Sequence, residues 1–135
     1  MSLHDKLQGQ AFQWAHNTFP QIRGQLFAVI NEVKRWPGEG DKAFMIRVQR
    51  LKAIGLVKGV PDLLLVVPGA TYAWDAKVKP DKLRPDQVDF IERLVSCAGN
   101  GWSFYSLEEF QQQFIKVMVR HYPGVAVMYP GLHIE

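Results

Sequence analysis

Residues 59–77 read GVPDLLLVVPGATYAWDAK, and this stretch decides the fold. The apolar run from Leu63 to Val67 predicts a buried strand. A proline-glycine turn follows, and residues 72–77 have the aromatic and alternating character of a second strand. Because so few residues separate the two strands, the sequence predicts an antiparallel hairpin.

The strand period places the polar residues of this hairpin. Alternate side chains of a strand point to the same face, so Asp75 and Lys77 share one face while Trp74, Ala76 and Val78 face a core on the other. Asp62 lies immediately before the first residue of the preceding strand. If the two strands are neighbours, Asp62 reaches Asp75, and two carboxylates and a lysine meet at one end of the hairpin.

Such a group suits a bound Mg²⁺ or Mn²⁺ ion. Mg²⁺ prefers oxygen ligands and binds proteins through one or two carboxylates, with waters completing the octahedron. Asp62 and Asp75 are the candidate ligands, and the carbonyl oxygen of Ala76 is a third. The ion would polarise a phosphoryl oxygen and lower the pKa of a bound water, while Lys77 positions that water. This is the chemistry of phosphodiester cleavage.

The triplet from Asp75 to Lys77 has a plainer interpretation on its own. An Asp-x-Lys sequence in a strand also occurs on solvated sheet faces, where the two charges pair weakly. The residues before the first strand favour the metal site. A carboxylate at Asp62, beside a buried strand, is costly unless it has a partner, and a metal ion would be that partner.

Three segments in order resemble the VRR-Nuc domain family of the PD-(D/E)XK nuclease superfamily. They are KAIGLVKGVPD at 52–62, DAK at 75–77 and LRPDQ at 83–87. In the last segment Pro85 stands where the first turn of a helix tolerates proline, and Gln87 lies in that turn. The resemblance covers the chain from about Gln8 to about Phe114.

The resemblance implies both a fold and an activity. The fold is α/β, a restriction-endonuclease-like core with a mixed central β-sheet flanked by helices on both faces. Asp62, Asp75 and Lys77 take the catalytic places, with Gln87 beside them. Stand-alone members of this length look like phage or prophage endonucleases that cut branched DNA, such as four-way junctions, as homodimers and leave a 5′-phosphate. A first-helix residue often joins the metal site in this superfamily, and Gln8 is the candidate here.

The positive charge lies close to the predicted site. The net charge is only +3, but residues 33–59 hold seven basic and two acidic side chains. A second basic strip consists of Lys77, Lys79, Lys82 and Arg84. Two basic strips that flank the carboxylates are the arrangement expected if a polyanionic backbone lies across the site. A solvated helix face is the alternative for the first strip. The candidate DNA-binding residues are Lys34, Arg35, Arg47, Arg50, Lys52, Lys58, Lys79 and Arg84.

The remaining elements follow from periodicity and capping signals. The expected order is helix, strand, helix, two strands, helix, strand and helix. The second helix should begin with Asp41 as its cap and pack Phe44, Val48 and Leu51 on the core. Outside the hairpin, the elements are predicted over His4–Asn17, Leu26–Ile30, Asp41–Gly55, Asp86–Ala98, Trp102–Tyr105 and from Ser106 onward, with a loop over Asn31–Gly40.

The chain is expected to form one domain. Residues 1–120 make the nuclease-like part, and residues 121–135 form a tail. Val125–Tyr129 could add an edge strand, which would either join a dimer interface or cover the sheet edge of its own chain. Trp36 and Trp102 could stack on unpaired bases, although burial in the core is favoured for both.

Composition excludes several other classes of protein. A single cysteine, Cys97, rules out a disulfide or a zinc cluster within the chain, and it is expected to be buried on the apolar face of its helix. No apolar stretch approaches a membrane span, and no signal peptide is visible, so a cytoplasmic protein is expected. A non-catalytic DNA-binding module with the nuclease fold, and a flap or restriction-type nuclease acting on other DNA, remain as alternatives.

Overall fold

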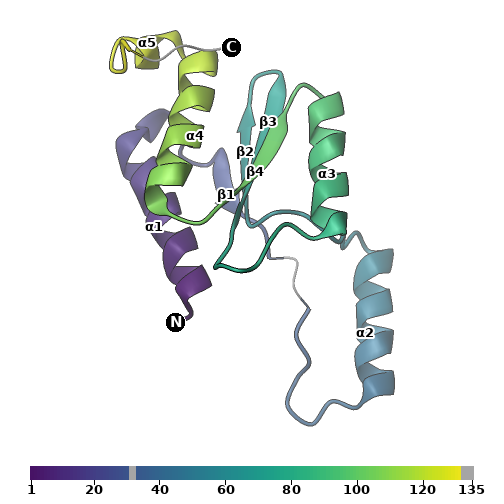
Figure 1. The fold of residues 1–135 in the computed structure, drawn as a ribbon. Coiled ribbons are helices and arrows are strands. Elements are labelled where there is room, and N and C mark those ends of the chain that lie inside the picture. The colour runs from purple at the N-terminus through teal and green to yellow at the C-terminus, as the bar shows by residue number, and fades with distance from the viewer. Residues whose placement is uncertain (31–32, 132–135) are drawn as a thin grey trace.

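The computed structural model describes residues 1–30 and 33–131, and its element order matches the predicted one with two short helices added (Figure 1). The elements are α1 (Leu3–Thr18), η1 (Pro20–Ile22), β1 (Leu26–Ala28), α2 (Asp41–Ala53), β2 (Leu63–Val67), β3 (Ala70–Ala76), α3 (Pro85–Ser96), β4 (Asn100–Phe104), α4 (Leu107–His121) and α5 (Pro123–Ala126).

A mixed four-stranded sheet in the order β1-β2-β3-β4 forms the centre of the molecule. β2 and β3 make the predicted antiparallel hairpin, in which Leu63 pairs with Trp74. β4 lies parallel to β3, so the chain needs a crossover between them, and α3 supplies it. Helices α1 and α4 cover one face of the sheet and α3 covers the other (Figure 1). The predicted fold class is confirmed.

Aromatic side chains fill the core between the sheet and α4. Trp74 is fully buried, with its ring centroid 5.5 Å from that of Phe110 and 5.2 Å from that of Phe114. Ala76 on the same strand face is also fully buried. The prediction that Trp74 and Ala76 face the core is therefore confirmed, and the opposite face of β3 is left for Asp75 and Lys77.

The first strand is shorter and less buried than predicted. β1 spans only Leu26–Ala28, and of its residues only Leu26 is buried. β1 is an edge strand that pairs with β2 alone, so its apolar residues have a neighbour on one side only. The loop predicted from Asn31 onward begins outside the described residues, which resume at Val33.

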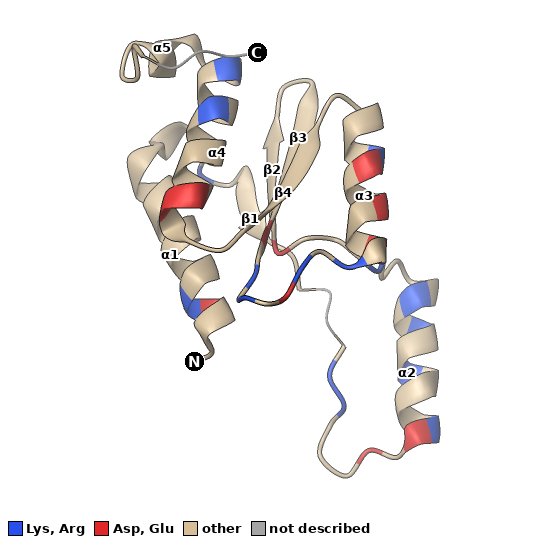
Figure 2. Ribbon diagram, viewed as in Figure 1, with Lys and Arg blue, Asp and Glu red and all other residues tan. Residues whose placement is uncertain are grey.

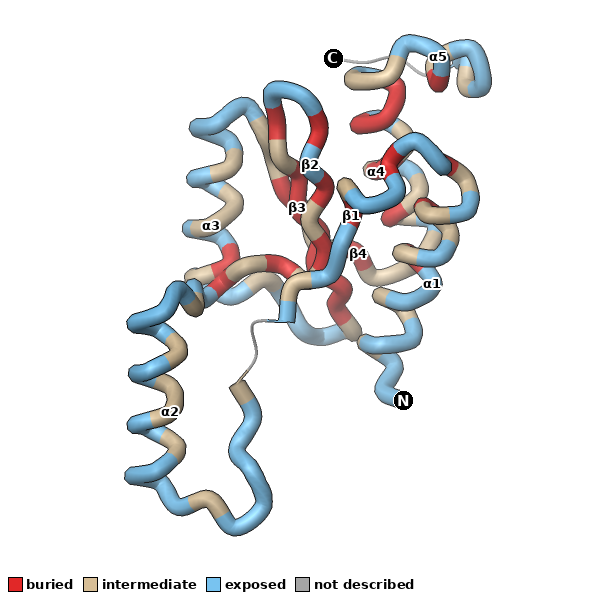
Figure 3. Tube along the Cα trace, turned by 180° about the vertical axis from the view of Figure 1, so that it is seen from behind, coloured by how far each residue is buried: buried red, intermediate tan, exposed pale blue. Residues whose placement is uncertain are grey.

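Helix α2 does not pack on the core, and the prediction of a core face there is wrong. Phe44, Val48 and Leu51 are only half-buried, and no residue of α2 is buried. The helix projects from the rest of the molecule (Figures 1 and 3). The side of α2 that carries Phe44 and Val48 borders an open cleft instead. Gly40, not Asp41, is the N-cap residue, because the helix already includes Asp41.

Two predictions near the C-terminus are also wrong. Cys97 is exposed, because α3 ends at Ser96 and the chain turns there through Ala98 at a φ of 67°. The expected edge strand over Val125–Tyr129 is absent from its described residues: Pro123 instead opens the short helix α5, whose Val125 is buried. Residues 132–135 of the tail lie outside the described part of the chain.

Candidate active site

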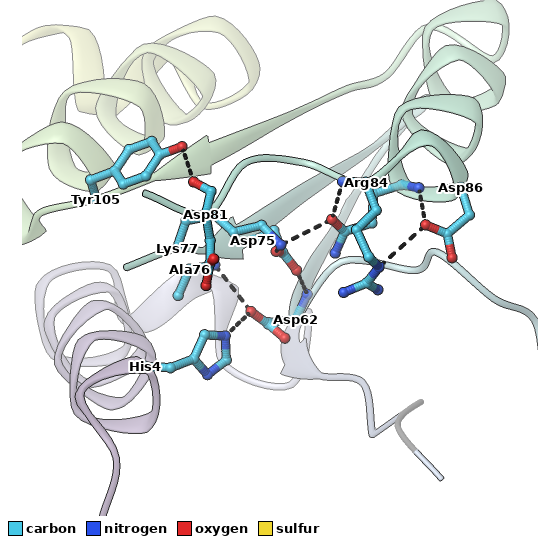
Figure 4. Close-up of polar contacts among 10 residues, drawn as sticks. His4, Asp62, Asp75, Ala76, Lys77, Asp81, Arg84, Asp86 and Tyr105 are labelled. Atoms are coloured by element: carbon cyan, nitrogen blue, oxygen red, sulfur yellow. Dashed lines mark hydrogen bonds and ion pairs between the residues drawn. The ribbon is translucent and has the colours of Figure 1, made fainter. Parts of the chain in front are cut away.

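The hairpin brings Asp62 and Asp75 together, as the strand period predicted. The pairing of Leu63 with Trp74 sets Asp62 beside the end of β3. The backbone N–H of Asp62 donates to Oδ1 of Asp75 at 3.1 Å, and the backbone N–H of Ala76 donates to Oδ2 of Asp62 at 3.0 Å (Figure 4). The N–H and C=O of one strand residue lie on the same edge of the strand, which turns the Ala76 carbonyl toward Asp62.

Lys77 completes a buried polar group on the same strand face. Its ammonium Nζ lies 2.8 Å from Oδ2 of Asp75 and donates to Oε1 of Gln87 at 3.0 Å. Asp75, Lys77 and Gln87 are 3%, 8% and 2% exposed, and they are the buried polar residues of the described chain. Buried charges are tolerated only when paired and hydrogen-bonded, and this arrangement meets that condition.

The first turn of α3 holds Gln87 in place. Pro85 is at the start of the helix, where its missing N–H costs nothing. Oε1 of Gln87 also accepts from the backbone N–H of Arg84 at 2.9 Å, while the backbone N–H of Gln87 donates to Oδ1 of Asp86 at 3.0 Å. Asp86 thus performs the capping that Arg84 cannot, and the Gln87 amide is fixed toward Lys77.

Gly59 allows the loop before β2 to reach the start of α3. It has a φ of +87°, and a Cβ there would lie 2.3 Å from the carbonyl oxygen of Asp86. Gly69, in the hairpin turn, has a similar φ of +81° with nothing within 4 Å of such a Cβ. Both glycines therefore adopt a positive φ that disfavours other residues, but only at Gly59 would a side chain also clash with a neighbouring segment.

We expect Gly59→Ala to lower the free energy of unfolding by roughly 3 kcal/mol, against about 1 kcal/mol for Gly69→Ala. Both variants place a side chain at positive φ. Only Gly59→Ala also creates a steric clash, which pushes the loop before β2 away from the Asp86 carbonyl. Urea unfolding of the two variants measures the difference. Equal losses would mean that the close approach to α3 adds no constraint.

His4 is a site residue that the sequence did not reveal. Its Nε2 lies 2.9 Å from Oδ2 of Asp62 (Figure 4). Gln8, the predicted first-helix residue, also lines the cleft, but His4, one turn earlier on the same face of α1, is the side chain in hydrogen-bond contact with a carboxylate. The four-residue spacing of His4 and Gln8 was the available signal.

The pKa values of Asp62 and His4 reflect both burial and the charge of the carboxylate pair. Burial and the nearby charge of Asp75 raise the pKa of Asp62 to about 6, against the partial relief given by His4 and the Ala76 amide. Burial alone would lower the pKa of His4, but the charge of Asp62 and hydrogen bonds to Asp5 and Asp62 outweigh it and raise that pKa. Added positive charge at this point would be strongly favoured.

An open cleft of about 1250 Å³ leads to this group. Its walls come from the start of α1, the end of β1, one face of α2 and the segment between β3 and α3. Three predicted DNA-binding residues line it, and Figure 2 shows lysine and arginine along α2 and before α3. Those three are Lys52, Lys58 and Arg84.

The other predicted DNA-binding residues lie outside the lining of this cleft. Lys34, Arg50 and Lys79 are exposed. Arg35 pairs with Asp41, and Arg47 with Glu39, so these two guanidinium groups already have partners within the chain. Arg47 therefore has a structural part in the protein whatever else it contacts.

Comparison with known proteins identifies the architecture. No family model matches the sequence, and no curated protein matches it. The solved structure of a VRR_NUC domain protein matches with a TM-score of 0.62 over 91% of this chain and 90% of that one, at 14% sequence identity. Within the described residues no helix has the length and apolar character needed to cross a bilayer. At this identity the likeness concerns architecture, and the chain has the VRR-Nuc fold with the restriction-endonuclease-like core that its motifs predict.

Proposed function

We propose that this protein is a Mg²⁺- or Mn²⁺-dependent endonuclease that hydrolyses phosphodiester bonds in branched DNA such as four-way junctions. The observation that carries the proposal is the meeting of Asp62, Asp75 and Lys77 at the floor of a cleft bordered by basic residues. The VRR-Nuc architecture supports a DNA-processing role. The active form is a homodimer, which would present one site to each of two strands.

The residues present fit a hard divalent cation. Two adjacent carboxylates, one with its pKa raised by burial and by the charge of the other, form a centre of negative charge. No group of three or more His, Cys, Asp or Glu side chains placed to hold a metal occurs among the described residues. The donors would be Asp62, Asp75 and the Ala76 carbonyl, with water for the rest, as Mg²⁺ prefers. A bound ion would supply Lewis-acid activation of the phosphate and of a water molecule.

The chain's own groups have separate parts in the reaction. Lys77 lines the cleft, and its Nζ, held between Asp75 and Gln87, has one N–H left to orient the attacking water and to offset charge that develops on the phosphate. Gln87 positions Lys77. His4 supports Asp62 and is the first-helix residue of the site.

The basic residues hold the DNA backbone over this floor. Lys52, Lys58 and Arg84 line the cleft, and the exposed Lys34, Arg50 and Lys79 extend the positive surface beyond it. Each phosphate they neutralise releases condensed cations, so binding should weaken steeply with salt. Arg35 and Arg47 contribute to the positive surface while paired within the chain.

Metal affinity should depend on pH through Asp62. Because the pKa of this carboxyl in the metal-free protein is about 6, a proton competes with the ion below that pH. We expect the Mn²⁺ association constant to fall as the pH is lowered, by up to about tenfold per unit below pH 6. Calorimetric titrations between pH 5 and 8 measure it. An affinity independent of pH would remove Asp62 from the ligand set.

The same raised pKa affects the stability of the metal-free protein. The folded state holds the Asp62 proton more tightly than the unfolded state, whose pKa is near the ordinary 3.8. The protonated Asp62 carboxyl therefore adds to the free energy of unfolding. This contribution is complete below about pH 4 and is lost as the pH rises through about 6. In Asp62→Asn, this decrease in the free energy of unfolding between about pH 4 and pH 6 should be absent.

A substrate panel tests the proposed selectivity. Purified protein is incubated with end-labelled four-way junction, flap, single-stranded and linear duplex DNA, each with Mg²⁺, Mn²⁺ or chelator. We expect metal-dependent cleavage that is fastest on the junction. Faster cleavage of flap or linear DNA would replace the branched-DNA proposal, and binding without any cleavage would favour a non-catalytic DNA-binding module.

A further inference from the structure

The two tryptophans that the sequence offered as stacking residues are placed very differently. Trp102 is half-buried and stacks on Tyr72, with ring centroids 6.0 Å apart and planes within 6°. Trp36 is 63% exposed, in the segment that precedes α2. We call residues 33–53, which comprise this segment and α2, the arm. The prediction of burial is wrong for Trp36, whose indole faces water on the arm.

Arg47 and Glu39 make the contacts that hold the Trp36 side chain in place. The Arg47 guanidinium lies 4.2 Å from the centroid of the Trp36 ring, within the range of a cation–π contact. Glu39 accepts two hydrogen bonds from Arg47, at 2.8 and 3.0 Å, and Arg47 also donates to the carbonyl of Lys34 at 2.6 Å. These hydrogen bonds from Arg47 hold the pKa of Glu39 at about 2. The Arg47 guanidinium on α2 thus connects this helix to the segment that precedes it, and it does so beside the indole ring.

The backbone of Trp36 is fixed as well. Its N–H donates to Oε1 of Glu39 at 3.1 Å, and the N–H of Glu39 donates to the Trp36 carbonyl at 3.0 Å. The contacts among Trp36, Glu39 and Arg47 are not part of the hydrophobic core, since no residue of α2 is buried. A bidentate ion pair with 8% and 18% side-chain exposure therefore serves to hold an exposed aromatic ring in one orientation. A pre-ordered ring loses little entropy when it binds.

The arm is continuous with the proposed DNA-binding cleft. Phe44, Val48 and Lys52 of α2 line the same cleft as Asp62 and Asp75. A DNA backbone lying in that cleft would pass along the arm, where further exposed cations are Lys34, Lys42 and Arg50. A negative partner that also offers flat aromatic surfaces fits both the charge and the ring.

We propose that Trp36 stacks on an unpaired nucleobase and that the arm thereby favours DNA with unpaired nucleotides, as at branch points, over continuous duplex. Bases inside a duplex already stack on their neighbours, whereas an unpaired base has a free face for the indole. Arg47 is the positioning residue for the ring. This inference rests on the proposed function, because it names what part of the DNA the arm recognises.

Binding without metal tests the inference apart from catalysis. Forked DNA carrying 2-aminopurine at its unpaired position, and blunt duplex of equal length, are titrated with protein in chelator while anisotropy and 2-aminopurine fluorescence are followed. We expect Trp36→Ala to weaken binding to the fork roughly 5- to 150-fold and to abolish fluorescence quenching. Duplex binding should change less than about twofold, and the salt dependence should not change, since no charge is lost.

Three further variants separate stacking from other causes. Trp36→Phe should retain part of the quenching. Ile46→Ala removes exposed apolar surface elsewhere on α2, where Ile46 is 52% exposed, and should behave as wild type. Arg47→Lys keeps the charge but loses the bidentate support, and should reduce quenching like Trp36→Ala.

Unchanged fork preference in Trp36→Ala would overturn the inference while leaving the nuclease proposal intact. A change from dimer to monomer in light scattering, with fork preference retained, would overturn it in favour of a subunit contact. If wild-type protein bound neither DNA in chelator yet cleaved with metal, stacking by a pre-ordered arm would also be excluded. If it neither bound nor cleaved any DNA, both proposals would fall.

Discussion

Lys77→Ala is expected to lower the rate of DNA cleavage by roughly 100- to 1000-fold while leaving DNA affinity within about twofold. Lys77 is 8% exposed on the cleft floor, and its ammonium is held by Asp75 and Gln87, so it is not a general phosphate contact. Loss of the ammonium removes the group that orients water and offsets developing charge. Single-turnover cleavage and anisotropy on the same DNA measure the two quantities.

The design needs controls for charge and for folding. Lys79→Ala removes a positive charge two residues away, where the side chain is exposed, and should lower affinity slightly without a comparable loss of rate. Lys77→Met keeps the length of the side chain and should be as inactive as Lys77→Ala. Thermal unfolding checks that each variant is folded. A normal cleavage rate in either Lys77 variant would remove the proposed water-positioning role.

Asp75→Asn is expected to weaken Mn²⁺ binding roughly 100-fold and to reduce cleavage at least as much. Asp75 accepts from the Asp62 backbone through one oxygen and pairs with Lys77 through the other. The new amide has only one acceptor, so it cannot satisfy both donors and it lacks the charge that holds the ion. Calorimetric Mn²⁺ titration gives the affinity independently of catalysis.

Asp81→Asn is the matched control for Asp75→Asn. Asp81 lines the same cleft, but it is exposed and is hydrogen-bonded through its backbone, whose N–H donates to the Val78 carbonyl and whose carbonyl accepts from the Tyr105 hydroxyl. Its substitution should leave Mn²⁺ affinity within about twofold. Equal losses in the two variants would mean that the ion responds to the overall negative charge of the cleft. The assignment of Asp75 as a ligand would then fail.

The hairpin shows how much of the fold and site can be predicted from sequence. The period of two on β3 fixes which side chains share a face, and a proline-glycine turn fixes the partner strand, so Asp62, Asp75 and Lys77 are brought together by local rules. Gln87 follows from the position of Pro85 at the start of α3. Each of these placements depends on residues close in the chain.

The errors arise where distant parts of the chain decide the outcome. Periodicity marks an apolar face on α2 but does not say whether anything packs against it, and here the face borders a cleft. His4 and Asp62 are 58 residues apart in sequence, and they meet only because the packing of α1 against the sheet brings its first turn close to the start of β2. Burial of Cys97 was expected from the helix pattern alone, yet α3 ends one residue earlier.

The most direct test is cleavage of an end-labelled four-way junction by one preparation of wild-type protein in parallel with Lys77→Ala. The account predicts cleavage by the wild type with Mg²⁺ or Mn²⁺, none in chelator, and at most about one hundredth of the rate in the variant. Cleavage that persists in chelator, or a variant as fast as wild type, would contradict a metal-dependent centre built on Asp62, Asp75 and Lys77.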